Sequence, residues 1–238
     1  MSKPPLPNVT GPTLSCTLPV SGTKIKYRPF VVKEQKALLL AQQSDDLDIV
    51  YDTIKSVINT CSNGSVEFDK LSTADVSYFF LQLRIASVGP EVDFALKCDN
   101  CDEVINSRLM LDDITIDTSA IVKDVKITDT VGIRFRLPTF DDSFKTVDDD
   151  DTSINMIYGL IDCLYDAKQV YLKSDYTGEE LKEWLLNLND SQVAGIDKFI
   201  SGIPELVHNL EFECTKCGTK HSRRLVGLQS FFRFSSAS

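Results

Sequence analysis

Two Cys-x-x-Cys pairs are the residues of this chain best suited to chemistry. The first pair lies in KCDNCDE at 97–103 and the second in ECTKCGTKH at 213–221, with 112 residues (102–213) between them. Each pair follows a segment whose alternating apolar residues are typical of a β-strand. Thiolates at this spacing bind one side of a metal ion or form a redox-active disulfide. Three interpretations are open: one shared metal site, two redox centres, or two unmetallated pairs.

A shared structural zinc ion (Zn) is the interpretation that the local sequence favours. Structural zinc takes four tetrahedral ligands, usually thiolates, and a zinc ribbon carries each cysteine turn at the tip of a hairpin. Gly218 suits the left-handed position of such a turn, which Asp102 takes in the first pair. Common ribbons separate their pairs by about 15–20 residues, but the cost of loop closure grows only logarithmically with length. We therefore predict a four-cysteine site formed by Cys98, Cys101, Cys214 and Cys217.

The same residues argue against an enzyme. Four cysteine ligands leave no coordination position for a reactive water. The chain has two histidines, and it contains no GxSxG, HExxH or phosphate-binding glycine motif. Neither cysteine pair shows the following helix of a thioredoxin-like redox motif. Two alternatives stay open: His221 in place of one cysteine ligand, and a thiol enzyme that uses one pair.

Composition limits the classes of partner. The net charge of −10 argues against a general nucleic-acid binder, although a local basic stretch is formed by Lys216, Lys220, Arg223 and Arg224. That stretch is either a docking face for an acidic partner or nucleic acid, or a solvated hairpin edge. No apolar run reaches the roughly 18–20 residues of a membrane span. The start of the chain lacks the apolar core of a signal peptide, which predicts a cytosolic protein with reduced thiols.

The remaining pattern predicts an α+β protein. An extended proline-rich arm (1–12) precedes a hairpin and helical part (13–89), in which Asp46 and the Ser72/Asp75 pair are helix-capping residues. A zinc-ribbon-containing part (90–238) carries a helical insertion at 153–203, with helices expected at 153–166, 179–188 and 191–202. The acidic run 141–151 reads as a solvated loop. The C-terminal tail gathers Phe231, Phe232 and Phe234.

Two stretches resemble a known family. They are IKYRPFVVKEQKALLLAQQSDD at 25–46 and VEFDKLSTADVSYFFLQLRIASVGPEVDFALKC at 66–98. Both are similar to the baseplate hub family of contractile-tailed bacteriophages of the T-even type. The most similar parts are RPF.VKE.KALLLA at 28–41 and LQLRIASVG at 81–89, which are patterns of helix faces and turns.

The resemblance implies a non-enzymatic structural subunit of the tail tip. Its partners would be other tail proteins of the hub, the spike and the tape-measure region, in a multimeric assembly. It would be built in the host cytoplasm and end in the virion. A cytoplasmic zinc-ribbon adaptor that binds nucleic acid or transcription machinery through 216–224 is the alternative of another class.

Overall fold

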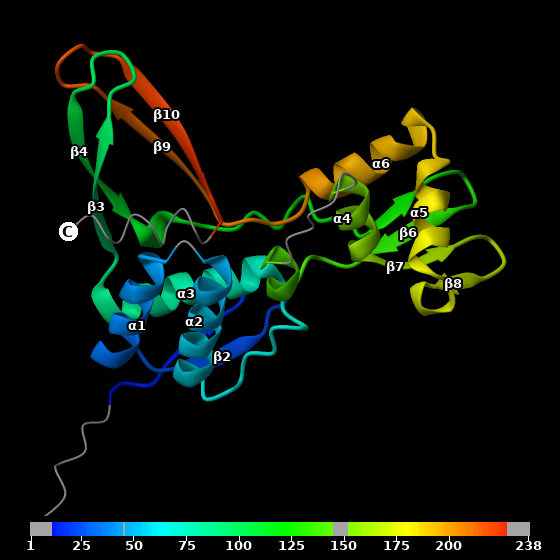
Figure 1. Cartoon of the computed structure of the whole chain (residues 1–238), viewed down its shortest axis with the longest axis horizontal. Coiled ribbons are helices and arrows are strands. Elements are labelled where there is room, and N and C mark those ends of the chain that lie inside the picture. The colour runs from blue at the N-terminus through cyan, green and yellow to red at the C-terminus, as the bar shows by residue number, and fades with distance from the viewer. Residues whose placement is uncertain (1–10, 45, 145–151, 228–238) are drawn as a thin grey trace, which may run out of the picture. The chain divides into compact units, whose positions relative to one another are not determined.

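The computed structural model describes residues 11–44, 46–144 and 152–227. Within these ranges the chain is a mixed α/β protein of six α-helices and small antiparallel sheets (Figure 1). The helices are α1 (Val32–Gln42), α2 (Leu47–Cys61), α3 (Thr73–Val88), α4 (Thr152–Leu160), α5 (Gly178–Leu186) and α6 (Asp190–Ser201). The strands are β1 (Leu14–Thr17), β2 (Lys24–Tyr27), β3 (Glu91–Lys97), β4 (Val104–Met110), β5 (Asp124–Lys126), β6 (Gly132–Phe135), β7 (Ile161–Tyr165), β8 (Val170–Leu172), β9 (Val207–Glu213) and β10 (Lys220–Val226).

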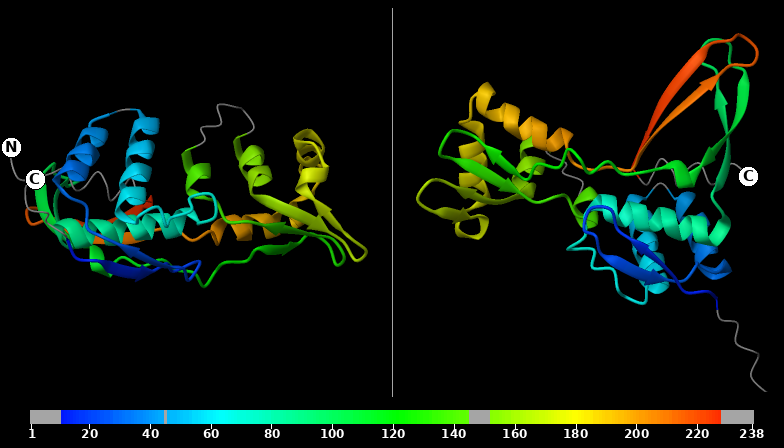
Figure 2. Two further views of the ribbon diagram at one scale, coloured as in Figure 1. Left: turned by 90° about the horizontal axis from the view of Figure 1, so that it is seen from below. Right: turned by 180° about the vertical axis from the view of Figure 1, so that it is seen from behind.

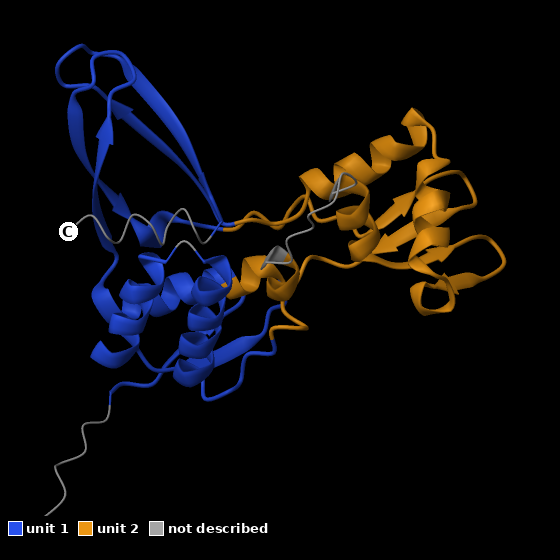
Figure 3. Cartoon of the chain, in the orientation of Figure 1, with its two compact units in different colours: residues 1–67, 77–115, 206–238 blue, residues 68–76, 116–205 orange. Residues whose placement is uncertain are grey.

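Contacts along the chain define two compact units (Figure 3). Unit 1 comprises residues 1–67, 77–115 and 206–238, and unit 2 comprises 68–76 and 116–205. β3 begins at Glu91, one residue after the boundary expected from the sequence, and the contacts group both cysteine hairpins with the N-terminal helices. An isolated antiparallel bridge pairs Thr115 with Val207, where the chain leaves unit 1 and returns to it.

Unit 1 begins with the predicted hairpin. β1 and β2 are antiparallel, with Thr17 opposite Lys24 at the turn end. Gly22 in that turn has a φ of +70°, a conformation that costs glycine little. Short strands of this kind are not stable alone in water; here the buried Ile25 and Tyr27 tie β2 to the core.

The helices of unit 1 start where the capping residues predict. The Asp46 carboxylate accepts the backbone N–H of Asp48 at 2.9 Å, which satisfies an orphan donor at the start of α2. α1 and α2 are joined by a short loop and pack side by side (Figure 2). In α3 the residues Phe79 and Leu83 are completely buried, so this helix forms the centre of the core.

Unit 2 is built on a four-stranded antiparallel sheet in the order β5-β6-β7-β8. Phe135 of β6 stacks on Phe199 of α6 with ring centroids 4.3 Å apart, and both side chains are buried. Thr177 and Glu180 form the expected capping box of α5. The sheet and the helices α5 and α6 thus share one apolar core.

One expected helix is wrong in its second half. The sequence predicted a helix over 153–166, but α4 ends at Leu160 and the chain continues directly as β7. Ile161 and Cys163 alternate as buried residues because β7 pairs with β6 on one side and β8 on the other. A short apolar run fits a buried strand and a helix equally well by periodicity, and only the tertiary pairing separates them. The insertion 153–203 therefore contains strands as well as helices.

Several predicted segments fall outside the described residues. They are most of the N-terminal arm, most of the acidic run and the aromatic C-terminal tail. Among the described residues, no helix combines the length and the apolar character that crossing a membrane requires.

A bidentate ion pair fixes the loop after β6. Arg136 donates from its two terminal nitrogens to Asp142 at 2.6 and 3.2 Å, and it also donates to the Gly159 carbonyl at 2.9 Å. The backbone N–H of Thr139 donates to the same carboxylate at 2.9 Å. Burial raises the pKa of Asp142, but the hydrogen bonds from Arg136 and Thr139 outweigh it and hold that pKa well below the usual range.

Asp142→Asn is expected to lower the stability of unit 2 by about 1–2 kcal/mol, since charged hydrogen bonds contribute about 1.5–3 kcal/mol and the pair is partly exposed. In the parent chain this stabilisation is fully present above about pH 4, the range of an unfolded aspartate. It is lost as the pH falls through the lower folded pKa. Urea unfolding of both chains at several pH values measures the effect. A difference that stays constant to pH 2 would contradict the assignment.

Candidate metal centre

Each cysteine pair lies in the turn of its own hairpin. β3 and β4 pair until Lys97 meets Val104, and β9 and β10 pair until Glu213 meets Lys220. The turns at 98–103 and 214–219 therefore have the same length. Alternating burial along β3 shows why this segment is a strand: Val92, Phe94 and Leu96 face inward and their neighbours face solvent.

The two turns also share one pattern of backbone hydrogen bonds. In the first turn, the N–H of Cys98 donates to the Glu103 carbonyl at 2.8 Å, and the N–H of Asp102 donates back to the Cys98 carbonyl at 3.0 Å. In the second turn, Cys214 donates to Thr219 and Gly218 donates to Cys214, both at 2.9 Å. The chain thus builds the same cysteine turn twice.

The left-handed position in each turn is the one predicted from the sequence. Asp102 has a φ of +57° and Gly218 a φ of +69°. Glycine adopts this conformation at little cost, and aspartate is among the few other residues that tolerate it. Once the chain has turned back, the backbone N–H of Glu103 donates to Cys101 Sγ and that of Thr219 to Cys217 Sγ. These bonds stabilise negative charge on the sulfurs.

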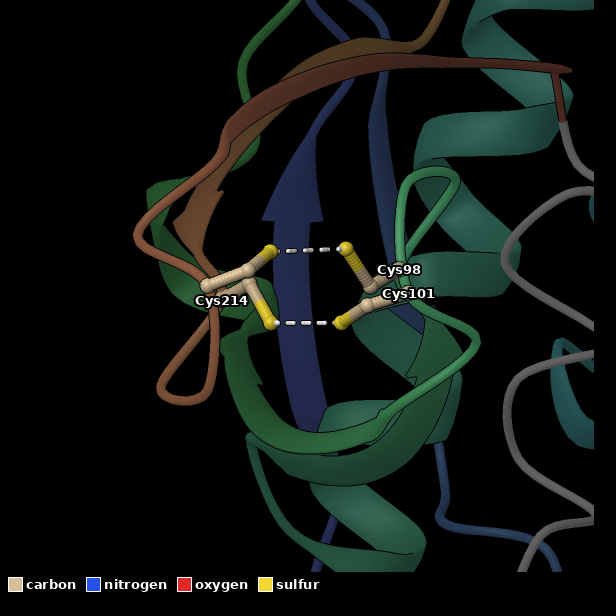
Figure 4. Close-up of side chains that lie close together, drawn as sticks. Cys98, Cys101 and Cys214 are labelled. Carbon is tan, nitrogen blue, oxygen red and sulfur yellow. Dashed lines mark hydrogen bonds between the residues drawn. The ribbon is translucent and has the colours of Figure 1, made fainter.

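The structure brings the four predicted cysteines together. Their Sγ atoms all lie within 4.8 Å of one another. The sulfurs of Cys98 and Cys217 are 3.6 Å apart, as are those of Cys101 and Cys214 (Figure 4). Both distances far exceed a disulfide bond of about 2.05 Å. Tetrahedral zinc with Zn–S bonds of about 2.3 Å separates its sulfurs by about 3.8 Å, so the set fits such an ion.

The environment of the four sulfurs is apolar on one side. Cys98 and Cys214 are buried and pack against Ile105 and Phe212. Cys101 is half-buried, and Cys217 is exposed. A metal ion held here would be shielded by the hairpins on one side and reached by solvent at Cys217.

The thiols differ in acidity. Hydrogen bonds from the Thr219 hydroxyl and backbone N–H lower the pKa of Cys217 to about 5. At Cys101 the Glu103 backbone N–H lowers the pKa, but lost solvation and the three neighbouring thiols outweigh it and raise the pKa to about 12. The Cys217 thiol therefore loses its proton easily, and the Cys101 thiol resists ionisation, because a second negative charge close to the first is unfavourable. A divalent cation bound between the sulfurs would offset this repulsion and lower the pKa of the Cys101 thiol.

His221 lies beside the cysteines and outside the set of four. Its Nε2 is 3.3 Å from Cys98 Sγ, and its Nδ1 is 3.3 Å from an Asp99 carboxylate oxygen. The ring stacks on Phe212 with centroids 4.8 Å apart, and the side chain is only 6% exposed. The imidazole is therefore held between a thiol and a carboxylate, with an aromatic ring against its face, so its orientation is fixed.

Half of the predicted basic stretch joins the two hairpins. Lys216 contacts Glu103 at 3.0 Å, and Arg223 contacts Asp99 at 2.8 Å. Asp99 and Glu103 were not singled out from the sequence. The sequence does indicate such a pairing, because the first turn carries acidic residues and the second carries basic residues. Two of the four basic residues are thus engaged between the hairpins.

One comparison with known proteins identifies the family. The model of the family described as T4 bacteriophage base plate protein matches residues 11–233. No curated protein and no solved structure matches the chain. The family match spans nearly the whole chain, including both cysteine hairpins. The chain therefore belongs to the T4 bacteriophage base plate protein family.

Proposed function

We propose that the chain is a structural, non-enzymatic subunit of the baseplate hub, at or near the axis of the phage tail. Membership of the baseplate family is the observation that carries this proposal. It makes the protein a structural component of the tail baseplate in the virion. The hub position rests on the resemblance of 25–46 and 66–98 to hub proteins, with hub, spike and tape-measure proteins as partners and assembly in the host cytoplasm.

The four cysteines hold one structural zinc in this proposal. The sulfur separations of 3.6 Å support it, and four thiolates leave no open position for catalysis. The ion joins hairpins that lie far apart in the sequence and adds to the ion pairs of Lys216 and Arg223. A hub subunit that must hold its shape under load benefits from such a cross-link, because exposed ion pairs alone contribute about 0–1 kcal/mol each.

Unit 1 also exposes apolar side chains that suit an assembly protein. Val32 and Leu39 are seven residues apart on α1, which is about two turns, so they share one face. They are 79% and 45% exposed, and the adjacent Leu40 is 59% exposed. We call these three residues the α1 patch. Apolar side chains gathered on one surface mark contact sites for partners.

The position in the tail is tested on purified virions of the phage that encodes the chain. A tag on the protein, located by electron microscopy of isolated tails, is expected at the tail axis. A tag found only at the periphery of the baseplate would overturn the hub assignment and leave the family membership intact. Absence from the tail in assembled virions would restrict the protein to an assembly role.

The double substitution Val32→Ser and Leu39→Ser is expected to reduce incorporation into baseplates by about tenfold or more, because 1.4 kcal/mol of lost contact already gives that factor. Folding stability should change by less than about 0.5 kcal/mol per site, since both side chains are exposed. Complementation of a phage that lacks the gene measures incorporation. Leu186→Ser is the matched control, because Leu186 is 68% exposed on α5 of unit 2. Equal incorporation of both variants would exclude the α1 patch.

A further inference from the structure

Unit 2 contains a groove with aromatic walls that the proposed hub role does not explain. The cavity has a volume of about 420 Å³, within the roughly 300–1,000 Å³ of ligand pockets. Its lining comes from β7, β8, α5 and the segments beside them, which lie together in Figure 1. Two leucines and four aromatic residues are part of this lining: Leu164, Leu181, Tyr165, Tyr171, Tyr176 and Trp184. We call this cavity the aromatic groove.

The sheet places two of the tyrosines. β7 and β8 pair with Leu164 opposite Tyr171 and Tyr165 opposite Val170. On the other neighbour of β7, Gly132 lies opposite Tyr165. A Cβ atom at Gly132 would clash with the Tyr165 ring, so the absence of a side chain there lets the ring lie over β6.

The aromatic faces of the groove are accessible from solvent. Leu164 and Leu181 are buried, whereas Tyr171 and Trp184 are half-buried and Tyr176 is 40% exposed. The rings of Tyr171 and Tyr176 are 6.4 Å apart between centroids and inclined by 54°. A flat group can therefore reach the rings without displacing the core.

Two carboxylates belong to the same lining, those of Asp166 and Glu180. Asp166 accepts two backbone N–H groups of the β7–β8 turn, at 2.7 and 2.9 Å, and the Tyr171 hydroxyl at 2.8 Å. Glu180 accepts the backbone N–H and the hydroxyl of Thr177 at 2.8 and 2.9 Å. The backbone N–H groups lower the pKa of both carboxyl groups, so both are charged at neutral pH.

Both carboxylates can accept further hydrogen bonds. A carboxylate has about four acceptor positions. Within the described part of the chain, these bonds use three positions on Asp166 and two on Glu180. Both bonds to Glu180 go to Oε2, which leaves Oε1 for a donor that enters the groove.

The charge of the chain is concentrated in the unit that contains the groove. Unit 2 holds 10 basic and 20 acidic residues, a net charge of 10 − 20 = −10, and unit 1 holds 15 of each and is neutral. A unit of this charge attracts basic partners and repels acidic ones. The groove therefore combines aromatic walls, fixed carboxylates and a negative surrounding field.

A lysine of unit 2 already makes a contact of the kind that the groove offers. Lys173 Nζ lies 4.1 Å from the centroid of the Tyr158 ring and donates to the Tyr158 carbonyl at 2.7 Å. Lys182 Nζ lies 5.6 Å from the centroid of the same ring. Tyr158 does not line the groove, so both lysines are directed at a ring outside it.

An arginine side chain fits this combination best. Its guanidinium group is planar, stacks on aromatic faces and presents N–H donors in a fork that matches a carboxylate. Lysine is a compact point charge that cannot stack in this way. We propose that the aromatic groove of unit 2 binds an arginine side chain from a basic segment of a partner protein. The guanidinium contacts the aromatic faces and donates to Glu180 and Asp166, and the inference depends neither on the metal nor on the hub position.

The chain reports on this groove by its own fluorescence. Trp184 is its single tryptophan, so intrinsic emission monitors one wall of the groove. A glycine–serine peptide with one central arginine, titrated into the full-length chain, is expected to change that emission with a Kd of about 1 mM, because one cation contributes modestly at an open site. The same peptide with citrulline, which has the shape of arginine without its charge, should give no saturation. A lysine peptide should bind about threefold more weakly or worse.

Substitutions in the groove should weaken the arginine peptide. Glu180→Gln is expected to reduce its affinity by about fivefold, and the glutamine still completes the capping box with Thr177. Glu179→Gln is the matched control, because it removes the same charge from α5 at a residue that does not line the groove. It should change the affinity by less than about twofold. Tyr176→Ala is expected to weaken binding by about fivefold through the loss of one aromatic face.

The partner is identified in assembled tails. Tyr176 is replaced with the photoreactive amino acid p-benzoylphenylalanine, which keeps an aromatic ring at this wall. Illumination is expected to link position 176 to an arginine-containing segment of another tail protein, which mass spectrometry of the linked peptides identifies. Replacing that arginine with glutamine should reduce the yield of the cross-link.

Four results would overturn the proposal. They are no response to the arginine peptide, an equal response to the citrulline peptide, equal losses in Glu179→Gln and Glu180→Gln, and cross-links only to segments without arginine. Circular dichroism of each variant shows that the fold is retained, so none of these results can be attributed to unfolding. A peripheral position in the baseplate would overturn the hub assignment and leave this binding unchanged.

Discussion

Replacing Cys214 with serine is expected to abolish the proposed zinc binding and to leave the two hairpins without their common attachment. Structural zinc contributes about 10–16 kcal/mol of apparent binding free energy in small zinc-finger peptides, so this is the largest effect that a single substitution should have here. Elemental analysis should give one zinc per parent chain and none per variant. Hydrogen exchange should show lost protection at 91–110 and 207–226, the two hairpins.

Cys16→Ala is the matched control for the metal site. Burial raises the pKa of the Cys16 thiol to about 11, so it stays protonated and is a poor ligand. This variant should keep its zinc. In the chelated parent chain, Cys217 should be the first thiol to react with iodoacetamide at pH 7, because its pKa of about 5 leaves it ionised.

Three results would contradict the proposal of a structural zinc ion or favour an alternative to it. A parent chain purified without metal, with full hairpin protection and no response to added zinc, would show that the ion is not part of the fold. Reversible formation of disulfides within each pair, with zinc absent, would support the redox interpretation instead. Salt-dependent binding to DNA would favour the adaptor alternative, since phosphate contacts release counterions.

Phe135→Ala is expected to destabilise unit 2 by about 3–5 kcal/mol. Phe135 is 1% exposed and Phe199 is 2% exposed, and the ring of Phe135 on β6 stacks on that of Phe199 on α6. The substitution removes the burial of a ring and opens a cavity that the sheet cannot fill. Urea unfolding measures the loss, and its midpoint for unit 2 should fall sharply.

Phe135→Leu is the conservative control and should cost roughly 1–2 kcal/mol, since part of the volume is retained. Zinc content should be unchanged in both variants, because the cysteines belong to unit 1. If Phe135→Ala unfolds with the parent midpoint, the core of unit 2 does not depend on this stack.

Local features were predictable because they depend on neighbouring residues. The left-handed φ of Gly218 follows from its place after Cys217, and the cap at Asp46 follows from its carboxylate next to free backbone N–H groups. The capping box at Thr177 has the same origin. In each case a side chain or its absence settles the conformation within a few residues.

Long-range features were predictable only where the chemistry was specific. Four thiols have one efficient way to share a cation, so the convergence of distant cysteines could be anticipated from type and spacing alone. The pairing of Arg223 with Asp99 could not, because any acid would satisfy an arginine. The strand β7 was missed for a related reason: its partners β6 and β8 decide its conformation.

The bridge between Thr115 and Val207 has an evolutionary consequence. Because the chain departs and returns at paired residues, the stretch 116–205 is a cassette whose two ends are already neighbours. Its length and content can diverge among related phages without altering the spacing of the sulfurs, since closing a longer excursion adds little entropy cost. Variation in size is therefore expected to concentrate in this cassette, and the hairpin turns are expected to keep their six residues.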